Sequence, residues 1–176
     1  MGGEDKRPPQ LIEDVRNKAG QHELKHEYWS AMGVDVVRHE LEVGDYTLAP
    51  KVSIDTKRNL TEFAGNLRTD HERFKAECVR AQDAGTLLVV LVENTQGIRN
   101  LGDLERWVES EWEFKRRRGK MPYKGASLAK VCRTMTERYG VLFDFCAPEE
   151  AAQRVVDLLE RGEEWVWRKR LSDTQS

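Results

Sequence analysis

The side chains best suited to chemistry are Asp45, Asp55 and Lys57. They lie within or beside two short apolar segments, residues 43–48 and 52–54, which predict an antiparallel hairpin. Such a hairpin brings Asp45 close to Asp55, although ten positions separate them. Because side chains alternate along a strand, Asp55 and Lys57 face the same way. Two carboxylates and one ammonium group are therefore expected to converge.

A pair of carboxylates with a nearby lysine suggests metal-dependent hydrolysis. Carboxylate oxygens suit Mg²⁺, which prefers a few carboxylates together with water and substrate phosphates. A lysine beside the ion can position or deprotonate a water, or stabilise the charge that grows on a phosphate under attack. An Asp-x-Lys pair at a hairpin edge is also common as an exposed salt bridge, so the spacing by itself leaves a purely structural role open.

Length and charge narrow the class of protein. The 176 residues fit one domain of ordinary size. Charged residues make up 34% of the chain, and the net charge of −2 gives no overall basic signal, so any nucleic-acid signal must be local. No apolar run has the length of a membrane span, and the N-terminus lacks the apolar core of a signal peptide. We therefore expect a soluble cytoplasmic protein with no membrane partner.

The cysteines indicate a reduced interior. Cys78, Cys132 and Cys146 are odd in number, widely spaced and set among apolar residues, so we expect free core thiols rather than disulfides. No Cys-x-x-Cys pair is present, which argues against a cysteine-based zinc site.

Apolar periodicity predicts that strands alternate with helices along the chain. Residues 87–92 are all apolar, the pattern of a strand buried on both faces. An alternation without internal repeats predicts an α/β sandwich, in which helices cover both faces of one mixed sheet. Outside the hairpin, the expected strands are residues 10–16, 34–41, 87–92 and 141–145, and the expected helices are residues 21–32, 59–67, 70–84, 101–108, 127–139 and 148–161.

Local signals predict how some of these helices begin and pack. Leu24, Tyr28 and Met32 recur at helical spacing and are expected to form the buried face of the first helix. Asp70 and Ser127 are expected to cap the N-termini of two later helices.

The order of the motifs resembles the nuclease domain of the XPF family, within the PD-(D/E)XK superfamily of restriction-endonuclease-like folds. The motifs are Gly44-Asp45-Tyr46, Ile54-Asp55-Thr56-Lys57, the helix over residues 60–67, the helical stretch Glu72-Arg73-Phe74-Lys75-Ala76-Glu77-Cys78, and a buried strand ending in Val92-Glu93. The resemblance covers residues 11–93 well and extends more loosely to residue 162. It is closest to short stand-alone forms found in phages and bacteria. It implies a three-layer α/β/α sandwich with a central mixed sheet.

The resemblance also implies roles for individual residues. Asp14-Val15-Arg16 corresponds to the family's Asp-x-Arg-Glu, Asp45 to the aspartate of Gly-Asp-Tyr, Asp55 and Lys57 to the Glu and Lys of Glu-Arg-Lys, and Arg73 to a helix arginine. Asp45 and Asp55, with Asp14 and the carbonyl of Thr56, would then bind Mg²⁺ or Mn²⁺. Lys57 would orient the attacking water, and Arg16 and Arg73 would contact DNA phosphates.

Several positions depart from the family pattern and favour a second candidate function. A non-catalytic DNA-binding module could keep the fold after losing turnover. The double helix-hairpin-helix region of longer relatives has no counterpart here, so we expect DNA affinity to come from this domain, from a homodimer or from a partner protein. The departures are Asp55 for Glu, Thr56 for Arg, Asn17 for Glu, Thr61 for an acidic residue with Glu62 one position later, and Glu77 for Gln.

A basic segment supplies the local signal for nucleic acid. Six cations within ten positions can neutralise several phosphates, giving an affinity that falls steeply with salt. Tyr123, in the same segment, is expected to stack on an unpaired base. A solvated charge run without function is the alternative. The cations, expected on an exposed loop, are Lys115, Arg116, Arg117, Arg118, Lys120 and Lys124.

One further motif suggests a different chemistry. His22, Glu23 and His26 satisfy His-Glu-x-x-His, in which two imidazoles one helical turn apart bind zinc and the glutamate activates water. A third ligand is not evident, because His39 and His71 fall in a strand and at a helix start. We favour an exposed helical face near the cleft over a zinc peptidase.

Taken together, the residues and the resemblance predict a Mg²⁺- or Mn²⁺-dependent DNA endonuclease, specific for branched, flap or fork structures. A role in replication, recombination or repair follows from the resemblance alone. Residues 1–9 are expected to form a flexible leader, residues 10–162 the XPF-type nuclease domain and residues 163–176 a C-terminal tail.

Overall fold

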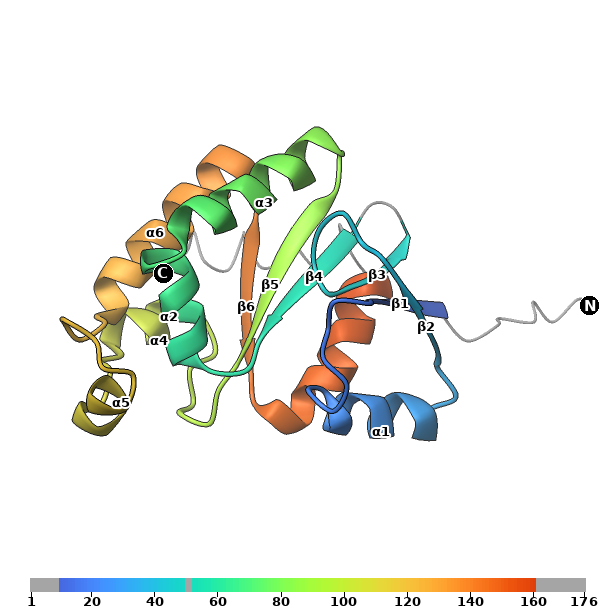
Figure 1. The fold of residues 1–176 in the computed structure, drawn as a ribbon, viewed down its shortest axis with the longest axis horizontal. Helices are drawn as coiled ribbons and strands as arrows, with labels where there is room; N and C mark the ends of the chain where they lie inside the picture. The colour runs from blue at the N-terminus through green and yellow to red at the C-terminus, as the bar shows by residue number, and fades with distance from the viewer. Residues whose placement is uncertain (1–9, 50–51, 161–176) are drawn as a thin grey trace, which may run out of the picture.

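The computed structural model describes residues 10–49 and 52–160 of the chain (Figure 1). The leader expected at residues 1–9 and the tail expected at residues 163–176 lie outside these described residues. The strands are β1 Gln10–Asp14, β2 Asp35–His39, β3 Tyr46–Ala49, β4 Val52–Lys57, β5 Leu87–Glu93 and β6 Leu142–Cys146.

These strands form one mixed sheet in the order β2-β1-β3-β4-β5-β6. β1 is parallel to β2 and antiparallel to β3, and β3 is antiparallel to β4. β4, β5 and β6 run parallel to one another. The predicted hairpin is therefore confirmed as β3 and β4, with Tyr46 opposite Ile54. Every residue of β4 is buried, so the strand that carries Asp55 and Lys57 lies in the middle of the molecule.

Helices cover both faces of the sheet (Figure 1). α2, α3 and α6 pack on one face, and α1 packs with the helical residues 151–160 on the other. Among the described residues, no helix combines the length and apolar character needed to cross a bilayer. The helices are α1 Glu23–Ala31, α2 Leu60–Arg68, α3 His71–Asp83, α4 Leu101–Arg106, α5 Glu111–Arg116 and α6 Gly125–Tyr139, with a short 3₁₀ turn η1 at Pro148–Glu150.

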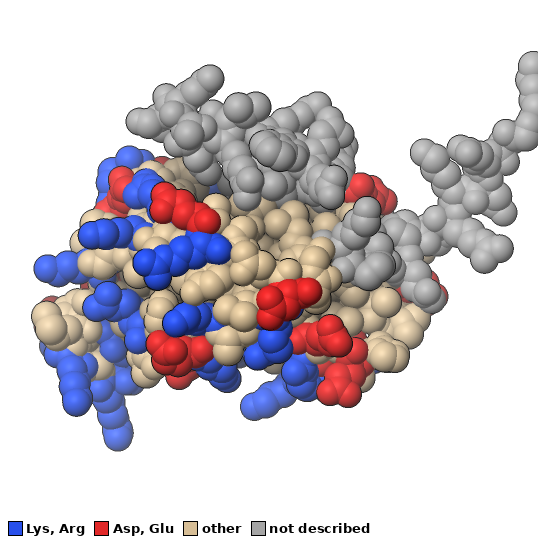
Figure 2. Space-filling model, turned by 90° about the horizontal axis from the view of Figure 1, so that it is seen from above, with Lys and Arg blue, Asp and Glu red and all other residues tan. Residues whose placement is uncertain are grey.

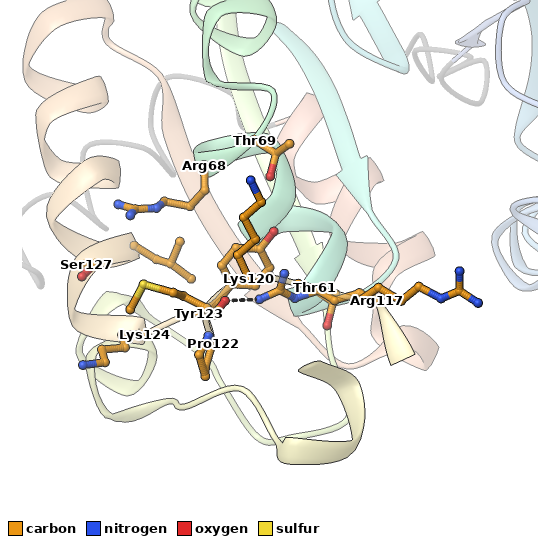
Figure 3. Close-up of a pocket in the computed structure, with 13 residues that line it drawn as sticks. Thr61, Arg68, Thr69, Arg117, Lys120, Pro122, Tyr123, Lys124 and Ser127 are labelled. Carbon is orange, nitrogen blue, oxygen red and sulfur yellow. Dashed lines mark hydrogen bonds between the residues drawn. The ribbon is translucent and has the colours of Figure 1, made fainter. Parts of the chain in front are cut away.

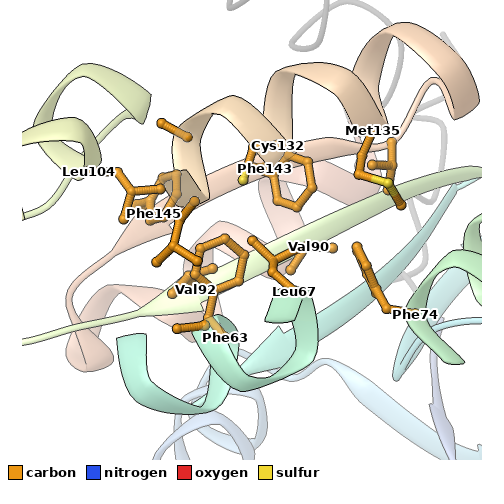
Figure 4. Packing of buried hydrophobic residues seen from close by; sticks show 14 of the residues in the cluster. Phe63, Leu67, Phe74, Val90, Val92, Leu104, Cys132, Met135, Phe143 and Phe145 are labelled. Carbon is orange, nitrogen blue, oxygen red and sulfur yellow. The ribbon is translucent and has the colours of Figure 1, made fainter. Parts of the chain in front are cut away.

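The core beneath α2, α3 and α6 is rich in aromatic residues (Figure 4). The ring of Phe63 lies edge-on to Phe143 and to Phe145, each with ring centroids 5.9 Å apart. Such edge-to-face pairs add specific geometry to the burial of apolar area. This core anchors α2 against β6 and so fixes the helix that borders the candidate site. Other members include Leu67, Phe74, Val90, Val92, Leu104, Cys132 and Met135.

The three cysteines are buried free thiols, as the sequence predicts. Burial raises the pKa of Cys78 to about 12, and the pKa of Cys146 to about 12. These side chains therefore act as small apolar core residues.

The packing of α1 differs from the sequence prediction. Leu24 and Met32, expected in the core, are 63% and 60% exposed. The helix instead buries Trp29 and Lys25, at 0% and 3% exposure. Lys25 can be buried because its ammonium group forms an ion pair with Glu93 at the end of β5. The apolar stripe was a wrong guide at Leu24 and Met32, because the helix is turned so that Trp29 is buried and donates to the carbonyl of Ala152 at 3.0 Å.

Two helix starts also differ from prediction. Asp70 precedes α3 but its side chain makes no capping hydrogen bond. α6 begins at Gly125, ahead of Ser127, because its first turn packs against the backbone of α4. A Cβ at Gly125 would lie 1.7 Å from the carbonyl oxygen of Leu104, so only glycine fits there. Lys115 and Arg116, expected on a loop, form the last turn of α5.

Candidate functional site

The β3–β4 hairpin presents Asp45 beside Asp55. The backbone N–H of Asp45 donates to the carbonyl of Ile54 at 2.5 Å, which sets Asp45 opposite the end of β4. Gly44 precedes it with a left-handed φ of +78°, and a Cβ there would lie 2.3 Å from Ser53 Oγ. Glycine is therefore required for the chain to turn sharply into β3 at this point.

The carboxylate of Asp45 is held by the residue that follows Asp55. Its Oδ2 accepts hydrogen bonds from the backbone N–H of Thr56 at 2.5 Å and from Thr56 Oγ1 at 2.9 Å. Burial and the nearby charge of Asp55 raise the pKa of Asp45 to about 8, against the opposing hydrogen bonds. Asp45 is thus oriented by the protein but carries its negative charge at a free-energy cost.

Asp55 and Lys57 face the same way on β4, as the strand alternation predicts. Lys57 Nζ lies 2.9 Å from Asp55 Oδ1 and 2.8 Å from Oδ2. Both residues are nearly buried, at 5% and 9% exposure. Asp55 Oδ2 is buried and accepts no hydrogen bond of good geometry. Burial would lower the pKa of Lys57, but the charge and hydrogen bond of Asp55 outweigh it and raise the pKa.

Glu77 on α3 joins this group, although in the sequence it stood out only as a departure, in place of the family's Gln. Its Oε1 accepts a hydrogen bond from the backbone N–H of Gly44 at 3.1 Å. Burial and the charge of Asp55 raise the pKa of Glu77. A signal was present in the sequence, because Glu77 lies one helical turn after Arg73, on the same helix face.

These residues line one cleft of about 250 Å³. The cleft brings together six residues that the sequence proposed as site residues. Both acidic and basic groups line it, and Glu77 and Arg80 belong to α3. The six predicted residues that line it are Asp14, Arg16, Asp45, Asp55, Lys57 and Arg73.

Asp14 and Arg16 are bound to each other at the edge of the cleft. Arg16 donates to Asp14 from its backbone N–H at 2.8 Å and from Nε at 2.9 Å, and its Nη2 forms an ion pair with the same carboxylate. Burial would raise the pKa of Asp14, but the hydrogen bonds and charge of Arg16 lower it. The Asp14 carboxylate is therefore already neutralised within the protein, unlike Asp45.

Arg73 stands exposed at the opposite edge of the cleft. Its side chain is 76% exposed and lies 3.5 Å from Asp70. A contact of that length at an exposed site holds the guanidinium weakly. The group is therefore available to an anion that enters the cleft.

The donor set fits a hydrated Mg²⁺. Within residues 10–49 and 52–160, no three His, Cys, Asp or Glu side chains are grouped so as to enclose a metal ion. Mg²⁺ needs fewer protein ligands, because it keeps several waters and takes one or two carboxylates plus substrate phosphates. The raised pKa of Asp45 and of Glu77 indicates a concentration of carboxylates that one lysine does not balance. A divalent cation at Asp45 and Asp55 would balance it.

The six cations of the basic segment have different environments. Lys115 pairs with Glu111 at 2.6 Å, and the guanidinium of Arg116 lies 5.1 Å from the centre of the Trp112 ring. Arg117 is committed to Glu109, with two contacts at 2.6 and 2.8 Å. The remaining three, Arg118, Lys120 and Lys124, line a second cavity of about 880 Å³ (Figure 3).

The His-Glu-x-x-His residues are arranged for structure. His22 is 5% exposed, and its Nδ1 lies 3.3 Å from Lys25 Nζ. Burial and the charge of Lys25 lower the pKa of His22 to about 4. His26 Nε2 contacts Glu13 Oε2 at 3.0 Å. The two imidazoles therefore have separate partners, and the expected exposed face is wrong for His22.

Solved structures support the architecture. XPF from Aeropyrum pernix is 17% identical with a TM-score of 0.60, over 88% of this chain and 62% of that chain. XPF from Aeropyrum pernix in complex with DNA is 18% identical with a TM-score of 0.61, over 89% of this chain and 66% of that one. The fold is XPF-like. The mixed sheet and the similar solved structures also confirm the restriction-endonuclease-like α/β sandwich that the sequence predicts.

This chain thus spans less than two thirds of the length of those XPF chains. No family model and no curated protein matches the sequence. At such low identity the similarity describes the fold, so the chemistry must be argued from the cleft itself.

Proposed function

We propose that this chain is a metal-dependent DNA endonuclease that hydrolyses phosphodiester bonds. The observation that carries the proposal is the convergence of Asp45, Asp55 and Lys57 on one cleft. The exposed guanidinium of Arg73 at the rim and a structure of similar fold in complex with DNA support DNA as the substrate. The order of the aspartate and the Asp-x-Lys motif in the sequence supports a site of the PD-(D/E)XK class.

In this proposal Asp45 and Asp55, with the carbonyl of Thr56, hold Mg²⁺ or Mn²⁺. The ion supplies Lewis-acid activation of the scissile phosphate and of a bound water. Lys57 orients the attacking water and offsets negative charge on the phosphate. Its 2.9 Å hydrogen bond to Asp55 fixes the ammonium group for that role. Asp14 would contribute only after its carboxylate leaves Arg16.

The proposed substrates are branched DNAs such as flaps and forks. The acidic cleft and the cavity of the basic segment lie on either side of α2, since Asn66 lines the first and Arg68 the second. Two separate contact regions favour a substrate whose strands diverge over a continuous duplex. Arg73 would contact a phosphate beside the scissile bond.

The test is cleavage of labelled flap, fork and duplex DNA with Mg²⁺ or with EDTA. Asp55→Asn keeps the shape of the side chain and should reduce cutting by at least about a hundredfold. Lys57→Met should do the same. Glu62→Gln is the matched control, because Glu62 pairs with Arg58 outside the cleft. Cutting by a correctly folded Asp55→Asn protein at the rate of the parent would refute the assignment.

A non-catalytic DNA-binding module is the second candidate. The observation that favours it is the closed Asp14–Arg16 pair together with Asn17, whose amide contacts Glu13 at 3.4 Å and supplies no carboxylate to the cleft. DNA binding by fluorescence anisotropy, with no nicking in Mg²⁺ or Mn²⁺, would select this candidate over the nuclease.

A further inference from the structure

A concentration of positive charge lies beside α2, on the side away from the acidic cleft. Residues 114–136 contain eight Lys and Arg and no Asp or Glu, in a chain of net charge −2. Figure 2 shows Lys and Arg gathered at the end of the molecule that holds α5 and α6 in Figure 1. Positive charge on an otherwise balanced protein marks a surface for a polyanion.

A cavity of about 880 Å³ opens at this end, between the last turn of α2 and residues 117–124. In Figure 3, Arg68 and Thr69 border it from α2, and Pro122 and Lys124 border it from the loop. No Asp or Glu lines it. The cations that line it without an ion pair among the described residues are Arg68, Arg118, Lys120 and Lys124.

Arg117 forms part of the wall of this cavity, and its own contacts within the protein hold it in place. Its guanidinium is bound by the buried carboxylate of Glu109, donates to the carbonyl of Met121 at 2.5 Å and stacks 3.8 Å from the centre of the Tyr123 ring. A Cβ at Gly119 would lie 1.8 Å from Arg117 Nη1, so glycine makes room for this arrangement. Arg117 thus has a structural role. It covers one face of the Tyr123 ring, the ring that the sequence predicts to stack on an unpaired base.

Three further features of the cavity lining bear on what it could bind. Arg118 has a left-handed φ of 54°, a conformation that is uncommon for a residue with a side chain. Thr61 Oγ1, on the α2 side of the cavity, is buried without a hydrogen-bond partner. Met121 is 71% exposed at the rim and offers an apolar surface. Cations, a free hydroxyl and an apolar rim together match phosphates joined to a base.

We propose that this cavity binds a single-stranded segment of DNA, the unpaired arm of a branched substrate. Its volume falls in the range of about 300–1,000 Å³ typical of small-ligand sites, which admits a few linked nucleotides. α2 contributes to both sites, Arg68 to the cavity and Asn66 to the acidic cleft, so an arm held in the cavity keeps the adjoining duplex near Asp55. The identity of the arm rests on the proposed function, whereas binding in the cavity does not require cutting.

The test is anisotropy of labelled single-stranded (dT)12, a blunt duplex and a splayed fork, with the full chain in EDTA so that no DNA is cut. The variant is Arg118→Gly/Lys120→Ala, which removes two cavity cations and gives the left-handed position a glycine. The control is Lys75→Ala/Arg138→Ala, which removes two cations that line neither cavity.

We expect the cavity variant to bind (dT)12 about tenfold more weakly and to reduce the slope of log K against log salt by about 1.4, because each phosphate contact contributes about 0.7. Binding of the blunt duplex should change no more than in the control. Competition by thymidine monophosphate at equal phosphate concentration would indicate a nucleotide site instead of a strand site.

Equal losses in the two double variants, or unchanged (dT)12 binding by the cavity variant, would overturn the proposal. A separate cleavage assay in Mg²⁺ distinguishes its failure from that of the proposed function. Selective strand binding without cutting leaves the cavity proposal standing and removes the nuclease. Cutting of branched DNA without selective strand binding leaves the nuclease proposal standing and removes the cavity proposal.

Discussion

Two polar clusters are buried on opposite faces of the same sheet, and they differ in charge balance. On the α1 face, Lys25 pairs with Glu93 and His26 contacts Glu13, so each carboxylate has its own partner. On the α2 and α3 face, one ammonium group, that of Lys57, serves several carboxylates. Those carboxylates are Asp45, Asp55 and Glu77.

The difference separates charge that is paired inside the fold from charge that a bound cation would balance. A balanced buried pair costs desolvation but is satisfied inside the fold, so it needs nothing from solution. A buried carboxylate that shares its cation with other carboxylates has a raised pKa, and a cation that binds it favours the ionised form. The same contrast holds in the basic segment, where Arg117 is saturated by Glu109 and Lys120 is not.

The strongest test of this comparison of the two clusters removes the ion pair between Lys25 and Glu93. Lys25→Met leaves Glu93 buried at 8% exposure without its cation. Removal of one partner of a buried pair costs about 3–5 kcal/mol, so we expect a loss of that size in the free energy of unfolding. Denaturant unfolding measures it.

The double variant Lys25→Met/Glu93→Gln provides the control, because it removes both charges. It should recover most of the loss. If Lys25→Met alone unfolds at the same denaturant concentration as the parent, the cluster is not a balanced structural pair.

This pair also shows where sequence reasoning ends. The hairpin and its Asp-x-Lys alternation depend on neighbours within about a dozen positions, so local periodicity predicts them. Lys25 and Glu93 are 68 positions apart, and no local pattern links them. The apolar stripe at Leu24 and Met32 suggested the wrong face of α1, because the tertiary contacts of Trp29 and Lys25 place the opposite face against the sheet.

The basic segment gives the intermediate case. α5 was missed because Lys and Arg dominate its second half, yet Ser110 and Glu113 form a capping box that is readable in the sequence. The sequence did not predict the cavity that the basic segment borders. Arg68, which lines it, belongs to α2, and Arg117 is ion-paired with Glu109.

A second balanced pair predicts a pH dependence. Burial would raise the pKa of Glu109, but hydrogen bonds from Arg117 and from the backbone of Tyr123 lower it. A carboxyl whose folded pKa is depressed adds stability above its unfolded pKa, and that stability is lost as pH falls through the folded value. Glu109→Gln should therefore cost about 1.5–3 kcal/mol at pH 7 and less at acid pH.

Unfolding followed at several pH values between 3 and 7 measures this difference, with Glu105→Gln as the matched change in an exposed pair with Arg133. The gap between parent and Glu109→Gln should narrow toward low pH. A gap that stays constant would mean that the ionic contact with Arg117 does not set the stability of the loop.

The unbalanced cluster should respond in the opposite way. Asp45→Asn keeps an oxygen for the Thr56 hydrogen bonds and removes a charge that burial and Asp55 oppose. We expect the free energy of unfolding to stay level or to rise by on the order of 1 kcal/mol, as is common when a strained functional group is removed. Thermal unfolding with and without Mg²⁺ measures it.

Mg²⁺ should stabilise the parent and leave Asp45→Asn unaffected, because an ion that binds only the folded state adds stability by mass action. Glu62→Gln, outside the cleft, should keep the response of the parent. Loss of stability in Asp45→Asn, or equal Mg²⁺ responses in all three proteins, would place Asp45 among the structural charges.

The smallest expected effect is at Leu24, next to the buried lysine. Leu24→Gln removes an apolar side chain that is 63% exposed, so it gives up little burial and should change the free energy of unfolding by less than about 0.5 kcal/mol. Leu104→Ala is the contrasting variant, because Leu104 is 0% exposed and its truncation should cost about 2–5 kcal/mol. Denaturant unfolding of both proteins measures the contrast. A large loss of unfolding free energy in Leu24→Gln would mean that the apolar stripe faces the core and that Lys25 points to solvent. The buried ion pair of Lys25 with Glu93, on which the comparison depends, would then not exist.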